Sequence, residues 1–162
     1  MKLKITALSM ALTLLATLSS CGKSDCKPIE PDKNLSCHAE ITHNDITYSA
    51  DLERQDGMGW KATFTAPQTV DGLEISLFDS SCTLDFKGLS YSAQRSELPQ
   101  GGMVTLLTAA LDNCINGKVK CVSDGQKVLQ RGEVEGMEFS ALFDSGKLES
   151  LEIFNNLTAK FT

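Results

Sequence analysis

The chain has 162 residues, a formal net charge of −6 at neutral pH and a sequence pI near 4.9. This length suits one domain with a sizeable hydrophobic core. The acidic balance argues against nucleic acid as a partner and against adhesion to anionic lipid through a basic patch. Six cysteines in a chain of this size indicate an oxidising, extracytoplasmic setting, provided that the protein is exported.

The first twenty residues predict export followed by lipidation. A basic start at Lys2 and Lys4 precedes a mostly apolar run over residues 5–18, which is shorter than the roughly 20 residues of a membrane-spanning helix. The run ends in Leu18-Ser19-Ser20-Cys21, which resembles the bacterial lipobox. In such signals the cysteine thiol receives a diacylglyceryl group and becomes the first residue of the mature protein. The alternative is an ordinary signal peptide with a cysteine nearby.

The sequence therefore predicts a protein held on the extracytoplasmic face of a cell membrane by two or more acyl chains on Cys21. Residues 1–20 are the expected signal peptide. Residues 21–34 are polar, contain Pro28 and Pro31 and show no periodicity, so they are expected to form a tether. Residues 35–162 show no repeat and no internal boundary, and they are expected to form one domain.

The domain begins with a series of short strands. Trp60, Ala62 and Phe64 alternate with polar residues, which is the two-residue period of a strand with one buried face. Pro67 ends that run because it cannot donate a ladder hydrogen bond. Turn residues separate other segments with the same alternation, before and after residues 60–66. The eleven expected strands cover residues 35–41, 46–54, 60–66, 73–77, 82–86, 89–93, 118–122, 127–131, 137–143, 148–154 and 157–161.

One helix is expected between the two groups of strands. Residues 103–111 place Val104, Leu107 and Leu111 on one side at helical spacing, and Thr105 is expected to face solvent. An antiparallel meander that is apolar on one face needs a cover over that face. The predicted fold is mainly β with one or two helices (α+β): a curved antiparallel sheet of about eleven strands with a helix on its apolar face.

This pattern resembles the LolA/LppX superfamily of lipoprotein carriers and lipid-binding lipoproteins. The resemblance covers roughly residues 36–162, and it implies an open half-barrel with a helix on the concave face and a hydrophobic ligand. The chain departs from the family pattern in its additional cysteines and in the lack of an amphipathic helix before the first strand. The segments that carry the resemblance are Phe64-x-x-Pro67, Gly72-Leu73-x-Ile75, Leu84-x-Phe86-x-Gly88-Leu89, Leu98-Pro99 and Asp144-Ser-Gly-Lys-Leu-x-x-Leu151-x-Ile153.

Nothing in the sequence indicates catalysis. The chain contains no nucleophile elbow, zinc-protease motif, P-loop or dinucleotide-binding glycine pattern. His38 and His43 are the only histidines, and a zinc site would need two further ligands. They are expected to be surface residues of a hairpin. The protein is thus expected to be no enzyme and to hold no cofactor and no metal.

Five cysteines remain after lipidation, so at most two disulfides can form within one chain. The expected pairs are Cys114 with Cys121, across a short loop, and Cys26 with Cys37, between tether and first strand. Cys82 is expected to be a buried thiol among apolar neighbours. A bridge between Cys82 and Cys114 is the main rival arrangement.

The apolar face of the sheet is the remaining candidate site. One short helix covers only part of a wide sheet, which would leave a cleft for an acyl chain or another lipid. The alternative is that the same side chains fill a core, in which case the protein is a structural or protein-interaction module without a small ligand. The residues expected to line such a cleft are Tyr48, Trp60, Phe64, Ile75, Leu77, Phe86, Tyr91, Val104, Leu107, Phe139 and Phe143.

Overall fold

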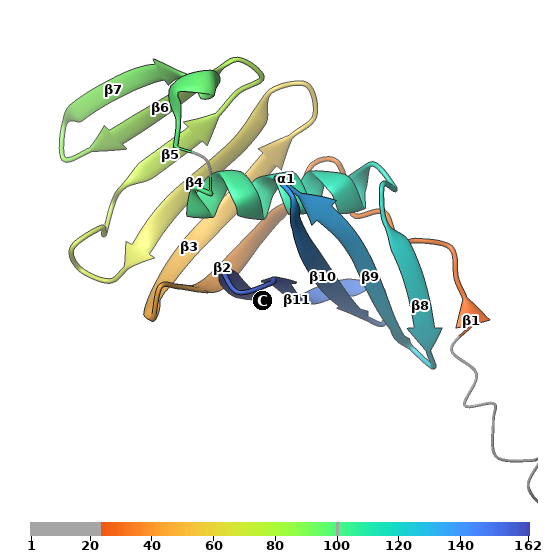
Figure 1. The fold of residues 1–162 in the computed structure, drawn as a ribbon. Helices are drawn as coiled ribbons and strands as arrows, with labels where there is room; N and C mark the ends of the chain where they lie inside the picture. Colours follow the sequence, from red (N-terminus) through yellow and green to blue (C-terminus); the bar gives the residue numbers. More distant parts are fainter. Residues whose placement is uncertain (1–23, 100) are drawn as a thin grey trace, which may run out of the picture.

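The computed structural model describes residues 24–99 and 101–162 as one twelve-stranded antiparallel sheet with a single α-helix, α1 (Met103–Ile115), in its concavity (Figure 1). The expected signal peptide and Cys21 lie outside the described residues. Within those residues, no helix has the length and apolar character needed to cross a membrane. The expectation of a mainly β fold, with an open curved sheet and a helix on it, is confirmed.

Two meanders make up the sheet. The first contains β2 (Ser36–His43), β3 (Ile46–Gln55), β4 (Gly59–Ala66), β5 (Glu74–Leu77), β6 (Ser81–Phe86) and β7 (Leu89–Gln94), followed by the short 3-10 helix η1 (Arg95–Glu97). The second contains β8 (Lys120–Asp124), β9 (Lys127–Val134), β10 (Met137–Asp144), β11 (Lys147–Ile153) and β12 (Leu157–Phe161). A two-residue strand, β1 (Ser24–Asp25), is the one strand that the sequence pattern did not predict.

The strand order explains why a helix lies across the sheet. The order is β1-β8-β9-β10-β11-β12-β2-β3-β4-β5-β6-β7, so β7 and β8 lie near opposite edges although they are consecutive in sequence. The connection between them must cross the sheet, and α1, about 20 Å long, is that connection (Figure 1). Pairing of β12 with β2 joins the two meanders in the middle of the sheet.

Cross-strand register gives the sheet an apolar inner face and a polar outer face. Trp60, Leu77, Cys82 and Ala93 are aligned across four neighbouring strands, so they lie on the same side of the sheet. The first three are buried, and this identifies the inner face that carries α1. The intervening row of Lys61, Ser76 and Thr83 is polar and lies on the outer face.

The helix is buried on almost all sides, which differs from the single apolar stripe expected. Leu106, Leu107, Ala110 and Leu111 have no exposed surface, and Thr108 is equally buried. The hydroxyl of Thr108 donates to the carbonyl of Val104 at 2.8 Å and so needs no outside partner. The prediction that Thr105 faces solvent is wrong, because the curved sheet surrounds the helix and leaves this residue half-buried. The helix also continues four residues beyond Leu111, to Ile115.

The segment expected to be a free tether is packed on the domain from Ser24 onward. Ser24 pairs with Ser123 of β8, and Cys26 forms a disulfide with Cys121 of the same strand. Ile29 packs against the core, and its carbonyl accepts a hydrogen bond of 2.7 Å from Nε2 of the buried Gln130. The chain between Cys26 and Asn34 therefore belongs to the folded domain.

Candidate functional site

Most of the expected cleft residues lie in a filled core beneath α1. The structure brings the expected residues of both meanders together on the inner face, and most of the largest of them are buried there. Tyr48, Ile75 and Phe86 are only partly buried, and Tyr91 is exposed. The buried members are Trp60, Phe64, Leu77, Val104, Leu107, Phe139 and Phe143.

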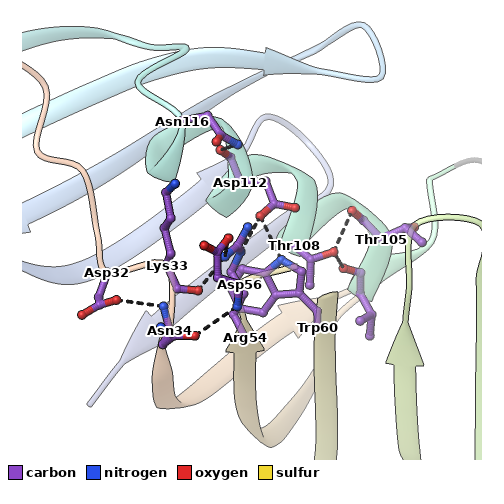
Figure 2. A network of polar contacts seen from close by, with 11 residues as sticks. Asp32, Lys33, Asn34, Arg54, Asp56, Trp60, Thr105, Thr108, Asp112 and Asn116 are labelled. Atoms are coloured by element: carbon purple, nitrogen blue, oxygen red, sulfur yellow. Dashed lines mark hydrogen bonds and ion pairs between the residues drawn. The ribbon is translucent and has the colours of Figure 1, made fainter. Parts of the chain in front are cut away.

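A polar network ties the C-terminal half of α1 to the first meander (Figure 2). Asp112 Oδ1 accepts hydrogen bonds from Arg54 Nε at 2.9 Å and from Trp60 Nε1 at 3.1 Å. Arg54 Nη1 also donates to the carbonyl of Lys33 at 2.5 Å. One carboxylate thus joins the helix to β3 and β4, while its arginine partner joins β3 to the N-terminal segment. These contacts hold the C-terminal half of α1 against the sheet and the N-terminal segment.

The other end of the inner face is open at what we call the edge cleft. This hollow of about 240 Å³ lies between β5, β6 and the first turn of α1. Side chains of Leu84, Leu98 and Met103 contribute to its walls, and carbon atoms form almost the whole surface. Its volume is just below the roughly 300–1,000 Å³ of small-molecule pockets. The full lining consists of Ile75, Leu77, Cys82, Leu84, Leu98, Pro99, Gly102, Met103, Val104 and Thr105.

Beyond the edge cleft, the inner face continues without a cover over the last two strands. Leu84 is aligned with Tyr91, and Phe86 with Leu89, so these four side chains share the side of the sheet on which the cleft lies. Leu89 is 76% exposed and Tyr91 is 64% exposed. We refer to these four residues as the β6–β7 apolar face. In Figure 1, β6 and β7 extend past the N-terminal end of α1.

One cation lies at the far end of the β6–β7 apolar face. Lys87 is in the turn between the two strands, and its ammonium nitrogen is 4.6 Å from the centroid of the Phe86 ring. A cation over an aromatic face is attracted by the ring quadrupole. The inner face therefore presents an apolar track that begins in the edge cleft and ends at a positive charge. From Cys82 to Phe86 this track is about 13 Å long.

A second and larger hollow, of about 670 Å³, lies between the N-terminal segment and the ends of β10, β11 and β12. Leu35, Phe143 and Leu148 form part of its floor. Its rim carries four charged groups, Asp32, Asp144, Lys147 and Glu149. The mixed charges make this hollow less suited to a purely apolar ligand than the edge cleft, because each charged group would lose hydration when covered.

One histidine contacts a residue of the first hairpin, and the other contacts the turn between β11 and β12. His38 Nδ1 lies 2.8 Å from Asp51 Oδ1 on the outer face, and His43 Nδ1 lies 3.0 Å from the carbonyl oxygen of Asn156. Among residues 24–99 and 101–162, no group of three or more histidine, cysteine or acidic side chains is placed to hold a metal ion.

The cysteine pairing differs from both expected bridges. Cys26 is bonded to Cys121, while Cys37, Cys82 and Cys114 are free thiols. The rival bridge between Cys82 and Cys114 is absent as well. Spacing along the chain suggested the short loop from 114 to 121, but Cys114 is on the buried side of α1 and Cys121 is on β8, beside the N-terminal segment. Pairing of β1 with β8 brings Cys26 to its partner across 95 residues of sequence.

The free thiols are held in their protonated form by burial. Burial raises the pKa of the Cys37 thiol to about 11, and the Asp51 carboxylate adds to this shift. Burial alone raises the pKa of Cys114 to about 12. It also raises the pKa of Cys82, against a smaller lowering by Arg95. Thiols in this state are poor nucleophiles at neutral pH.

Four residues of the open end were missed by the sequence-based expectation: Leu84, Leu89, Leu98 and Met103. Leu84 and Leu89 share the alternation of Cys82, Phe86 and Tyr91, so the strand pattern contained the signal for them. Nothing in the local pattern distinguishes Leu98 and Met103 as cleft residues. Their role depends on where the connection from η1 to α1 crosses the sheet.

No family model matches this chain, and no curated protein sequence matches it. Among solved structures, the chain is similar to a crystal structure described as a LolA superfamily protein from Nitrosomonas europaea. The TM-score is 0.40 with 7% sequence identity, over 83% of this chain and 86% of that chain. A likeness at this level leaves membership of the superfamily a prediction.

Proposed function

We propose that this protein is a membrane-anchored, extracytoplasmic lipoprotein that carries out no catalysis and binds one acyl chain in the edge cleft. The observation that carries the proposal is the uncovered inner face. The edge cleft of about 240 Å³ continues into the β6–β7 apolar face, where Leu84 and Phe86 are partly buried and Leu89 and Tyr91 are exposed. Burying their surface would be favourable by about 25 cal/mol for each Å² removed from water.

The shape of this region favours a long, thin ligand. The cleft takes one end of a chain between β5, β6 and Met103, and the remainder lies along the track past Leu84 and Phe86. Each buried methylene contributes about 0.8 kcal/mol, so ten or more methylenes can offset the loss of freedom on binding. An acidic head group would end beside Lys87, which makes a fatty acid or an anionic lipid the ligand class.

The membrane anchor is supported by the sequence alone. Cys21 follows a basic start, an apolar run and a lipobox-like ending. Cys21→Ala is expected to release the domain from the membrane or to leave the precursor unprocessed. Subcellular fractionation combined with intact-mass measurement tests this, and a processed Cys21→Ala protein that stays in the membrane contradicts the anchor.

Ligand binding is tested with a matched pair of substitutions. Tyr91 and Phe154 are both 64% exposed, but only Tyr91 lies on the β6–β7 apolar face. Tyr91→Ser is expected to weaken binding of a fluorescent long-chain fatty acid several-fold, whereas Phe154→Ser leaves the affinity unchanged. Equal effects of the two substitutions, or no binding by the wild-type protein, would refute the ligand site.

A second candidate function rests on the edge of the sheet. β7 is an edge strand with one unpaired side, and exposed edges of this kind add strands from partner proteins. In that case Leu89 and Tyr91 would contact a protein, and the filled core beneath α1 would be purely structural. Native mass spectrometry after purification from the host distinguishes the two, since only the first function predicts co-purifying lipid.

A further inference from the structure

The two edges of the sheet differ in how they are protected against pairing with another strand (Figure 1). At one edge, β1 is only two residues long and includes Asp25, and the neighbouring β8 begins at Lys120 and ends at Asp124. Short strands and charged side chains are common protections of an exposed edge. At the other edge, β7 is six residues long and has no charged residue, no proline and no bulge in its pairing with β6. β7 is therefore open to a further strand.

The turn between β6 and β7 decides which backbone groups of β7 point toward β6. Lys87 and Gly88 have φ values of 50° and 84°, as in a two-residue hairpin turn with positive φ at both positions. The residues that flank such a turn form a hydrogen-bonded pair, so the N–H of Leu89 points toward β6. This direction alternates along an antiparallel strand. The N–H of Arg95 donates to the carbonyl of Ser80 at 2.9 Å, which continues the same alternation.

The residues between these positions, Ser90, Ser92 and Gln94, direct their backbone groups away from β6. The N–H of Gln94 accordingly donates to the Glu97 carboxylate at 3.0 Å, so it is already occupied. β6 is the one strand that pairs with β7 within the described residues. Ser90 and Ser92 are thus the two residues of β7 whose N–H and carbonyl groups are both left for a further strand.

A second copy of β7 matches these two residues through a two-fold axis. When Tyr91 of one copy is opposite Tyr91 of the other, Ser90 is opposite Ser92 of the second copy, and Ser92 is opposite its Ser90. Residues in a hydrogen-bonded antiparallel pair exchange both of their N–H···O bonds. Every N–H and carbonyl group of these serines is then paired, in both copies.

The neighbouring registers leave some of these groups without a partner. An axis at Ser92 would place Ser90 opposite Gln94, whose N–H is bound to Glu97. An axis at Ser90 would place Ser92 opposite Gly88, which lies in the turn and outside the strand. An axis between two residues would set inward side chains opposite outward ones. The axis at Tyr91 is therefore the register that β7 favours.

This register also brings exposed apolar side chains together. Tyr91, 64% exposed, meets Tyr91 of the second copy, and Leu89, 76% exposed, meets its Ala93. Side chains of non-hydrogen-bonded pairs are the closest across a ladder, and aromatic pairs there are favourable. Because β7 has no charged residue, the net charge of −6 puts no like charges into the ladder. A different protein would have to supply a matching strand, whereas the second copy supplies it from the same sequence.

We propose that two copies of this chain pair antiparallel through β7, with the two-fold axis at Tyr91, and so form one continuous sheet. The pairing uses the edge of β7, whereas the edge cleft lies between β5, β6 and α1. It therefore does not depend on the proposed acyl chain. The shared ladder is short, so the fraction of dimer is expected to rise with protein concentration.

The register is tested by disulfide cross-linking of the full-length protein in cells of its host. Tyr91→Cys puts two cysteines in a non-hydrogen-bonded pair with Cα atoms roughly 4.5 Å apart, a separation that a disulfide spans. Leu89→Cys is the control on the same face, because it lies four positions, roughly 13 Å, along the ladder from its own copy. After oxidation, Tyr91→Cys is expected to give several-fold more cross-linked dimer than Leu89→Cys. The wild-type protein gives the background from its own thiols.

A mixed experiment tests the same register from the other direction. Leu89→Cys and Ala93→Cys are co-expressed with different tags, and they are expected to cross-link with each other several-fold more than either does with itself. Equal yields from Leu89→Cys and Tyr91→Cys, or no dimer from Tyr91→Cys, would overturn the proposal. A cross-linked product whose mass is not twice that of the subunit would also overturn it, since a different protein then occupies the edge.

The backbone contribution is tested with Ser90→Pro and Ser90→Ala in detergent-solubilised full-length protein. Proline removes an N–H that points away from β6, so the ladder with β6 is retained while a donor to the second copy is lost. Alanine keeps this N–H. Sedimentation is expected to show a several-fold lower dimer fraction for Ser90→Pro and an unchanged one for Ser90→Ala. Equal fractions would contradict the pairing, provided that circular dichroism shows both variants folded.

Binding of a fluorescent long-chain fatty acid is measured on the same samples. Ser90 alternates with Leu89 and Tyr91, so its side chain is on the outer face and outside the proposed ligand site. A wild-type protein that binds the fatty acid but stays monomeric contradicts only the pairing. A dimer that binds no fatty acid contradicts only the proposed ligand site.

Discussion

The indole nitrogen of Trp60 donates a hydrogen bond of 3.1 Å to the carboxylate of Asp112, so the only tryptophan of the chain connects β4 to α1. The same oxygen accepts from Arg54 Nε at 2.9 Å (Figure 2). A helix that crosses a curved sheet is thus fixed at one end by charge-assisted hydrogen bonds. Its other end lies beside an apolar hollow.

Asp112→Ala is expected to destabilise the domain by about 1–3 kcal/mol, because it leaves the Arg54 guanidinium and the Trp60 N–H without their shared acceptor. The Arg54 side chain is only 13% exposed, so water cannot fully replace the lost carboxylate. Denaturant unfolding measures the loss. Asp56→Ala is the control, since Asp56 is exposed and 3.9 Å from Arg54. The interpretation fails if both substitutions have the same small effect.

Leu107→Asp is expected to abolish cooperative unfolding, because an unpaired carboxylate at a fully buried position costs several kcal/mol. This is comparable with the total stability of a domain, about 5–15 kcal/mol. Binding of an apolar dye to the exposed inner face provides a second readout. Leu89→Asp makes the same change at a position that is 76% exposed, and it should alter stability by no more than ~0.5 kcal/mol. Similar behaviour of the two variants would show that α1 is not an essential cover.

Lys87→Glu is expected to weaken the binding of a long-chain fatty acid about fivefold, since an exposed charge pair contributes up to about 1 kcal/mol. The affinity for the corresponding neutral alcohol should not change, because the alcohol has no carboxylate to meet the charge. Titration with both ligands at low and high salt measures the difference, which salt should reduce. An equal loss for acid and alcohol would place the head group elsewhere.

Cys26→Ser is expected to lower the free energy of unfolding by about 2–4 kcal/mol, because the disulfide closes a long loop in the unfolded chain. The variant should also be cleaved faster by trypsin after Lys33, once the N-terminal segment can leave β8. Cys37→Ser, which removes a free thiol, is the control for cysteine replacement. Alkylation of both Cys26 and Cys121 in the native, unreduced protein would rule out this bond.

The buried thiol of Cys114 is expected to make stability fall at alkaline pH. Its pKa is raised from the ordinary 9.0 to about 12, so the folded state retains a proton that the unfolded state loses. The contribution of the protonated Cys114 thiol to the free energy of unfolding is complete below pH 9.0 and is lost as the pH rises from 9.0 towards 12. Comparing wild type with Cys114→Ala isolates this effect, with a difference in slope of at most about 1.4 kcal/mol per pH unit. Parallel pH profiles of the two proteins would contradict it.

The sequence by itself determined the strands, because the alternation of residues such as Trp60, Ala62 and Phe64 is a local property of a strand with one buried face. All eleven expected strands are present, with ends that differ by at most three residues. The helical spacing of Val104, Leu107 and Leu111 predicted the position of the helix. The strand alternation predicted the apolar character of the inner face. The lipobox-like ending at Cys21 is also a purely local signal.

The tertiary structure decided what depends on contacts between distant segments. The partner of Cys121 is set by the pairing of β1 with β8, and no spacing rule connects residues 26 and 121. The exposure of Thr105 depends on how far the sheet curves around α1, and so does the division of the apolar residues between core and cleft. Leu77 and Tyr91 have the same pattern in sequence, yet one is buried and the other exposed, because α1 reaches only the first of them.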